Sequence, residues 1–276
     1  MPWTPAAGTE PVFAALAEAP THRGRPDPVI VEGAVPVQRA IEAGLTVHAV
    51  AATATALTGL PTPAEPVPAW RADAAELAAA LGYPFRRGCV AIVARPAAPP
   101  LSEALTRWAG GAQPVVVVAE QLADPVNVGA VLRNARAFGA AGVVFVGGAD
   151  PLTPRAIRSS VGHVFGQPWT LGQDPVVVAQ ALRGHGFRSW AATVAADAVD
   201  IADVPGGPVA LWLGTEGPGL SARVHATIAD RTTVPIAGDV DSLNVAAASA
   251  VMLHVLTRRP SATVRIDPGR GATDRA

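Results

Sequence analysis

Four short runs of almost purely apolar residues mark the second half of the chain. They occupy residues 115–119 (VVVVA), 142–147 (GVVFVG), 190–194 (WAATV) and 209–214 (VALWLG). Strands that are apolar along their whole length are typical of a parallel sheet covered on both faces. Segments with helical periodicity separate or follow these runs, at 129–138, 154–161, 176–185 and 242–256. The pattern therefore predicts an α/β domain built on a mostly parallel sheet.

The first third of the chain predicts a smaller α/β unit. Strands are predicted at 28–33, 46–52 and 89–94, and helices at 12–19, 34–44 and 72–82. The proline-rich stretch LPTPAEPVPAW at 60–70 interrupts this pattern, and no element is predicted there.

These patterns divide the chain into four parts. The small N-terminal domain comprises residues 1–95, a linker 96–113, the larger domain 114–259 and a tail 260–276. The linker is rich in proline and glycine at both ends, with one short helix predicted at 102–108. The tail is polar with scattered glycine and proline, so we expect it to be disordered.

Composition adds an expected compartment. Half of the 276 residues are hydrophobic and the mean hydropathy is +0.31, yet no run approaches the roughly 18 apolar residues of a membrane span. The sequence MPWTPAAGTEP at the start has neither the basic region nor the apolar block of a secretory signal. We therefore expect a cytoplasmic protein with no membrane partner.

Lysine is absent from the chain and cysteine occurs once, and both facts exclude some classes of function. All 21 basic residues are arginine, which excludes Walker-type nucleotide binding and Schiff-base chemistry, because both need a lysine. The single cysteine, Cys89, excludes internal disulfides and CxxC chemistry, and no ligand cluster for a metal is evident. The net charge of −1 gives no global attraction for nucleic acid, so any such contact must depend on local arginine clusters.

The first candidate segment, AEQLADPVNVGAVLRNARAFGA, directly follows the predicted strand at 115–119. Asn127 and Gly129 lie at the mouth of a helix that then carries Arg133 and Arg136. Ligands of open α/β sheets bind beyond the carboxyl ends of strands, which favours a site here. A helix cap followed by ordinary surface arginines is the alternative interpretation.

The second candidate segment is LWLGTEGPGLS, in which a strand leads straight into Gly214, Glu216, Gly217 and Gly219. Glycines so placed allow a sharp turn or the close approach of a ligand to the backbone. The segment lacks the dinucleotide fingerprint GxGxxG, which argues against a nucleotide-binding oxidoreductase. An ordinary glycine-rich turn remains the alternative.

The third candidate segment is TTVPIAGDVDSLNVAAASAVMLHVL. Val234 and Ile236 flank a proline at the end of a predicted strand, and a loop leads to Ser242. Ser242 is predicted to cap the alanine-rich helix that follows, with Asn244 in its first turn. Taken alone, a cap explains this segment.

Together the three segments resemble the SpoU (TrmH-like) family of RNA ribose 2′-O-methyltransferases in the SPOUT superfamily. The resemblance covers about residues 114–256 and is specific, because three motifs occur in the family's order and at its separations. The sequence departs from the family pattern at Ala246, where serine is usual, and at His254-Val255, where an acidic residue is usual. The matching residues are Asn127-Val128-Gly129, Arg133 and Phe138-Gly139, then Gly214-Thr215-Glu216-Gly217-Pro218-Gly219, then Val234-Pro235-Ile236 and Ser242-Leu243-Asn244-Val245.

The resemblance implies a fold and a methyl donor. It predicts a SPOUT domain with a trefoil knot, and residues 1–95 are similar, more loosely, to the family's L30e-like RNA-binding domain. The donor, S-adenosylmethionine, is expected among the knot loops, with no metal. Its backbone contacts are predicted at Gly214, Val234, Ile236 and Leu243.

The resemblance also implies roles for polar residues. Arg133 is expected to hold the phosphate beside the target nucleotide and to stabilise the developing alkoxide, since arginine stays protonated. Positioning roles fall to Asn127, Glu216, Ser242 and Asn244, and RNA contacts to Arg136, Arg155, Arg158 and Ser160.

The predicted function is ribose 2′-O-methylation of ribosomal RNA by a homodimer that packs through the knotted domain. Two alternatives stay open: methylation of transfer RNA, and a donor-binding protein that acts on a small molecule.

Overall fold

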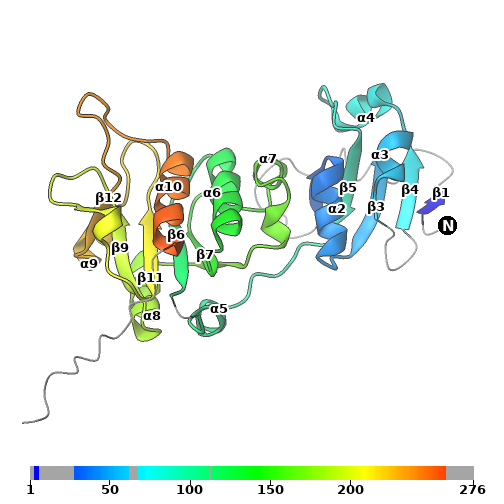
Figure 1. Ribbon diagram of the computed structural model, residues 1–276. Coiled ribbons are helices and arrows are strands. Elements are labelled where there is room, and N and C mark those ends of the chain that lie inside the picture. Colours follow the sequence, from blue (N-terminus) through cyan, green and yellow to red (C-terminus); the bar gives the residue numbers. More distant parts are fainter. Residues whose placement is uncertain (1–2, 6–27, 62–66, 112, 259–276) are drawn as a thin grey trace, which may run out of the picture.

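A computed structural model of the chain describes residues 3–5, 28–61, 67–111 and 113–258. The described residues form two α/β units, each built on its own sheet, that lie side by side (Figure 1). The helix predicted at 12–19 and the tail predicted at 260–276 lie outside the described residues. No helix among the described residues is long and apolar enough to cross a membrane.

The C-terminal unit contains a seven-stranded sheet in the order β10-β12-β9-β11-β6-β7-β8. Every pair of neighbouring strands is parallel, which confirms the predicted mostly parallel α/β fold. The sequence did not predict the short strands β8 and β10, and β12 ends before the predicted strand end at Val234–Ile236. The strands are β6 (Val115–Glu120), β7 (Gly142–Val146), β8 (Trp169–Gly172), β9 (Arg188–Ala192), β10 (Val199–Asp200), β11 (Val209–Leu213) and β12 (Arg231–Thr233).

Helices cover both faces of this sheet, so alternate residues of each strand are buried in opposite layers. Val115 and Val117 of β6 pack in one layer, whereas Val116 and Val118 pack in the other. The first layer contains α6 (Pro125–Phe138), α7 (Pro154–Ser159), α10 (Val245–Thr257) and the short 3₁₀ helices η1 (His163–Phe165) and η2 (Ile201–Asp203). The second contains α5 (Leu101–Trp108), α8 (Pro175–Gly184) and α9 (Ala222–Thr227).

The helix predicted inside the linker, α5, packs against the C-terminal sheet. Leu105 is fully buried, and the ring of Trp108 lies against the start of β7. A Cβ added to Gly142 would lie only 2.3 Å from that ring, so this glycine permits the contact. The connection between the two units is therefore shorter than the predicted linker 96–113.

The N-terminal unit contains a five-stranded mixed sheet in the order β1-β4-β3-β5-β2. The predicted strands and helices from residue 28 onward are found, but the proline-rich stretch also contains β4, whose Pro68 was taken to interrupt the pattern. The elements are β1 (Trp3–Pro5), β2 (Val29–Glu32), α2 (Ala34–Glu42), β3 (Val47–Ala52), α3 (Ala54–Thr58), β4 (Val67–Arg71), α4 (Ala74–Leu81) and β5 (Cys89–Val93).

A buried carboxylate joins the two units. Glu32 at the end of β2 is 3% exposed and accepts a 2.7 Å hydrogen bond from the Arg158 guanidinium of α7. Tyr83 donates to its other oxygen, and Arg87 lies 3.7 Å away. Burial and the bond to Glu32 raise the pKa of Tyr83 well above its ordinary value, so the phenol stays a donor. Removing one partner of such a buried pair is costly, so these contacts fix α7 against the N-terminal sheet.

Candidate active site

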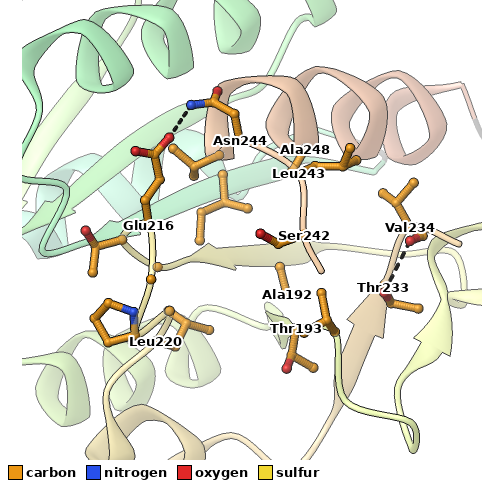
Figure 2. Close-up of a pocket in the computed structure, with 18 of the residues that line it drawn as sticks. Ala192, Thr193, Glu216, Leu220, Thr233, Val234, Ser242, Leu243, Asn244 and Ala248 are labelled. Carbon is orange, nitrogen blue, oxygen red and sulfur yellow. Dashed lines mark hydrogen bonds between the residues drawn. The ribbon is translucent and has the colours of Figure 1, made fainter. Parts of the chain in front are cut away.

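The three candidate segments meet at the carboxyl edge of the C-terminal sheet, and Asn244 joins them. Its side-chain amide donates to the Asn127 carbonyl oxygen at 3.2 Å and to a carboxylate oxygen of Glu216. Figure 2 shows the Asn244–Glu216 bond across the opening of a pocket. Residues 117 positions apart in the chain thus share one hydrogen-bond network.

Asn244, rather than the predicted Ser242, caps α10. The Asn244 side-chain oxygen accepts from the backbone N–H groups of Ala246 at 2.9 Å and Ala247 at 3.4 Å. The predicted cap at Ser242 is therefore wrong, because the helix begins two residues later than expected. Ser242 instead lines the pocket (Figure 2). One asparagine consequently performs both tasks: its oxygen caps the helix and its amide joins the network.

The pocket beneath this network has a volume of about 490 Å³. All four positions expected to hold the donor line it, as do Glu216, Ser242 and Asn244. Sequence reasoning missed the lining contributed by the end of β9, by β12 and by the buried side of α10, because these positions become neighbours only in the sheet. The missed residues include Thr193, Leu220, Thr233, Ala248 and Met252.

A tight hairpin between β11 and α9 forms one wall of the pocket. Thr215 and Gly219 exchange backbone hydrogen bonds of 3.2 and 3.0 Å, and Gly219 has a φ of +70° that disfavours other residues. Gly214 packs directly under this turn. A Cβ on Gly214 would lie 2.2 Å from the carbonyl carbon of Gly219 and 2.3 Å from the nitrogen of Leu220.

Replacement of Gly214 by alanine should therefore displace the hairpin, since both obstructing atoms belong to the backbone. We expect the affinity for S-adenosylmethionine to fall at least about tenfold, a loss that calorimetry measures directly. Gly184→Ala, at the end of α8, is the matched control, because nothing lies within 4 Å of a Cβ added there and its φ is not positive. Equal donor affinity of the Gly214 variant and wild type would contradict this account of the wall.

A buried carboxylate that the motifs do not include anchors the hairpin. Glu120, the last residue of β6, is 3% exposed and accepts hydrogen bonds from the backbone N–H of Ser221 at 2.8 Å and from its hydroxyl at 2.6 Å. Ser221 in turn caps α9. A polar residue at the end of an otherwise apolar run was the only sequence signal for this anchor.

The residues predicted to contact RNA differ in exposure and in their partners. Arg133, Arg136 and Arg155 are exposed, whereas Arg158 is held by Glu32. Ser160 is fully buried, and its hydroxyl donates to the carbonyl oxygen of Ile157. Ser160 therefore cannot contact RNA in this conformation, and we withdraw it from the candidate RNA contacts.

Arg133, the expected catalytic arginine, does not line the pocket of its own chain. It lies on the exposed side of α6, almost two turns beyond Asn127. Among the residues that the structure describes, its guanidinium has no hydrogen bond or ion pair. This side chain is accordingly available to bind an anion.

The glycine of the first motif has a packing role. A Cβ on Gly129 would lie 1.9 Å from the Ser159 hydroxyl and 2.3 Å from the Ala156 carbonyl oxygen. Only glycine lets α6 approach α7 so closely. The motif thus combines Asn127, which accepts a hydrogen bond from Asn244 but does not itself line the pocket, with a glycine that sets the helix–helix distance.

Cys89 is unsuited to nucleophilic chemistry. It is fully buried in β5, and burial raises the pKa of its thiol to about 12. No group of three or more His, Cys, Asp or Glu side chains that could hold a metal occurs within the described ranges.

Comparisons with known proteins agree with the geometry. The model of the SpoU rRNA methylase family matches residues 114–254. An uncharacterized tRNA/rRNA methyltransferase of Mycobacterium tuberculosis is 35% identical over 237 residues, which cover 83% of this chain and 81% of that protein. The 23S rRNA (guanosine-2′-O-)-methyltransferase RlmB of Photobacterium profundum is 32% identical over 54% of this chain and 62% of its own.

A solved structure shows the same architecture. The SpoU methyltransferase AviRb of Streptomyces viridochromogenes, in complex with the cofactor AdoMet, superposes with a TM-score of 0.71 at 26% identity, over 89% of this chain and 95% of its own. This chain belongs to the SpoU rRNA methylase family. The predicted family and its methyl donor, S-adenosylmethionine, are thereby confirmed.

The pocket fits this donor in size and chemistry. Its volume lies within the roughly 300–1,000 Å³ of small-molecule sites. Leu243, Val234 and Ile236 offer apolar contacts for an adenine, and Gly214 leaves the backbone open to close approach. Glu216 places a carboxylate in a site that must accept a positively charged sulfonium.

Proposed function

We propose that the protein transfers a methyl group from S-adenosylmethionine to a ribose 2′-hydroxyl of ribosomal RNA in the cytoplasm. The hydrogen bonds of Asn244 to Asn127 and Glu216 are the observation that carries the proposal, since they join one polar residue from each motif in a network beside the pocket. The relative named for guanosine-2′-O-methylation of 23S rRNA supports the choice of hydroxyl and substrate.

Each side chain has a proposed task at the opening. When bound, the donor supplies an electrophilic methyl group. Asn244 and Asn127 orient the Glu216 carboxylate, and Ser242, which lines the pocket, positions the ribose (Figure 2). The S–C bond breaks as the O–C bond forms, and the hydroxyl proton passes to solvent.

Arg133 is proposed to hold the phosphate beside the target nucleotide. A ribose hydroxyl is a poor nucleophile, so a fixed cation near its oxygen lowers the cost of the developing negative charge. Arginine keeps its proton and therefore acts as an electrostatic stabiliser rather than a base. An RNA strand that lies along α6 would bring its phosphate to Arg133 while its ribose enters the opening.

Two other substrates compete with ribosomal RNA. Incubation with tritium-labelled donor and separate pools of ribosomal RNA, transfer RNA and small metabolites distinguishes them. Label in ribosomal RNA is expected. Label in transfer RNA alone would establish the second substrate, and donor binding without any RNA labelling would favour the small-molecule activity.

We also propose a homodimer that packs through α10. This helix contains no Asp, Glu, Lys or Arg, and Val251 on its outer face is 43% exposed. An apolar helix normally buries such a face. The expected trefoil knot in the same part of the chain stays a prediction.

A charge on that face should prevent dimerisation. Light scattering is expected to show a dimer for the wild type and a monomer for Val251→Glu. Val177→Glu is the control, since Val177 is 58% exposed on α8 in the opposite layer. A monomeric wild type, or a Val251 variant that stays dimeric, would contradict the proposed interface.

A further inference from the structure

A cluster of four basic side chains lies where the two α/β units meet. It consists of Arg39 on α2, Arg133 and Arg136 on α6, and His163 at the start of η1; we name it the junction cluster. The Arg39 guanidinium donates to the Val161 carbonyl oxygen, and that of Arg136 donates to the Gly166 carbonyl oxygen at 3.2 Å. These two acceptors flank His163 in the chain, so one arginine from each unit is hydrogen bonded to the segment that carries the imidazole.

The junction cluster lacks neutralising carboxylates. Within the described part of the chain, none of its three arginines has a carboxylate oxygen within 4.0 Å, and the nearest acidic residue on α2, Glu42, is hydrogen bonded to Gln38. Arg87 and Arg158, at the same junction, are both paired with Glu32. In a chain with a net charge of −1, this concentration of unpaired positive charge is a local feature that favours an anionic ligand.

The position of the cluster is fixed by tight packing. Gly162 lies against α2 so closely that a Cβ there would be 2.8 Å from the Cα of Pro36. Val161 adopts a φ of +54°, which costs energy for a β-branched residue. This strained backbone aims the Val161 carbonyl at Arg39. The geometry therefore keeps Arg39 and His163 together without a ligand.

Since Arg133 belongs both to this cluster and to the proposed reaction, the two sites are continuous along α6. We propose that the junction cluster binds phosphodiester groups of the RNA substrate, with Arg39 of the N-terminal unit and His163 as contacts that the motifs do not include. This inference rests on the proposed function and names the surface by which the N-terminal unit helps to hold the RNA. Arginines suit this task through paired hydrogen bonds to phosphate oxygens.

The state of His163 agrees with an anion site. Burial lowers the pKa of His163 below its ordinary value, and the positive charges of Arg39, Arg136 and Arg133 lower it further. A bound phosphate would offset that repulsion and favour the protonated ring. RNA affinity should therefore rise as the pH falls from about 8 to about 6, and rise less in His163→Gln.

The test is a salt titration of RNA affinity by fluorescence anisotropy. Two probes of equal length are used, a fragment of ribosomal RNA and an unrelated RNA hairpin, because phosphate contacts are independent of sequence. The variants are Arg39→Gln, Arg136→Gln and His163→Gln. Arg183→Gln, which changes an exposed arginine on α8, is the matched control.

Each arginine variant should lose roughly tenfold in affinity for both probes, with donor affinity unchanged. The slope of log affinity against log salt should fall by about 0.7 to 0.9 per arginine removed. Arg39→Lys, which keeps the charge, should retain most of the slope, and this separates ligand contact from a purely structural role. If Arg39→Gln and Arg136→Gln showed the same salt dependence of affinity as Arg183→Gln, the proposed RNA contact would be wrong. A wild type that binds neither probe would also contradict it.

The outcomes are separable from those of the proposed function. A wild type that transfers no methyl group to RNA would contradict the proposed function. The junction cluster is tested separately, by the slope of log affinity against log salt. A wild type that methylates RNA with slopes unaffected by Arg39 or Arg136 overturns only the cluster.

Discussion

Replacement of Asn244 by alanine is expected to abolish detectable methyl transfer and to weaken donor binding. The change removes the amide that holds Asn127 and Glu216 together, and it removes the oxygen that caps α10. Loss of the cap alone should cost about 1 kcal/mol of folding stability. The loss of the network should misplace the wall and opening of the pocket, so both donor affinity and turnover should fall.

Asn244→Ser separates the two tasks of the asparagine. Serine is also a good N-cap, so this variant should keep the stability of the wild type, measured by thermal unfolding. It cannot hold both partners of the amide, so its transfer rate should still fall about a hundredfold. A serine variant with wild-type activity would show that capping, and not the network, is what matters.

Replacement of Arg133 by alanine should abolish transfer while leaving donor affinity within about twofold of the wild type. Arg133 does not line the donor pocket, but it is proposed to hold the phosphate and stabilise the developing charge. Removal of one such electrostatic contact commonly lowers the rate by a factor of about 10² to 10³. Single-turnover transfer and calorimetry of donor binding give the two quantities separately.

Arg183→Ala serves as the control for the loss of a positive charge, since it lies on α8 in the opposite layer. It should transfer methyl groups at the wild-type rate. Equal losses of donor affinity and rate in Arg133→Ala would instead assign this arginine to the donor pocket.

The sheet was predictable from sequence where its strands are apolar on both faces. Val115–Glu120 and Val209–Leu213 form central strands, and their side chains meet helices above and below. The edge strand Trp169–Gly172 contains one polar residue, Thr170, and half-exposed Leu171, so no continuous apolar run marks it. The strand predicted to end at Val234–Ile236 corresponds to β12, which ends at Thr233, and the burial of its Thr232 comes from tertiary contacts that the local pattern does not indicate.

Part of the lining of the candidate pocket was predictable from sequence, but its geometry was not, and Arg133 and Asn127 do not line it. The four donor positions all line one pocket, because motifs at the ends of parallel strands share a sheet edge. The helix start moved from Ser242 to Asn244, since either residue can cap and only the folded network decides between them.

The predicted RNA contacts stay predictions, but the N-terminal unit changes the surroundings of these arginines in ways that the sequence did not indicate. The sequence around Arg158 predicts an exposed side chain, but Glu32, 126 residues earlier in the chain, accepts a hydrogen bond from its guanidinium. Arg39 was not singled out, because its neighbours Val161 and His163 are distant in the chain. Contacts between the two units could not be predicted from the sequence pattern, because the residues that form them lie far apart in the chain.

The position of the transferred methyl group tests the central claim most directly. Ribosomal RNA labelled by the protein and tritiated donor is hydrolysed with alkali, which cleaves every phosphodiester next to a free 2′-hydroxyl. Label is expected in an alkali-resistant dinucleotide, because a 2′-O-methyl group blocks cleavage at that position. Label recovered on a base in mononucleotides, or no label in RNA from protein that binds the donor, would contradict it.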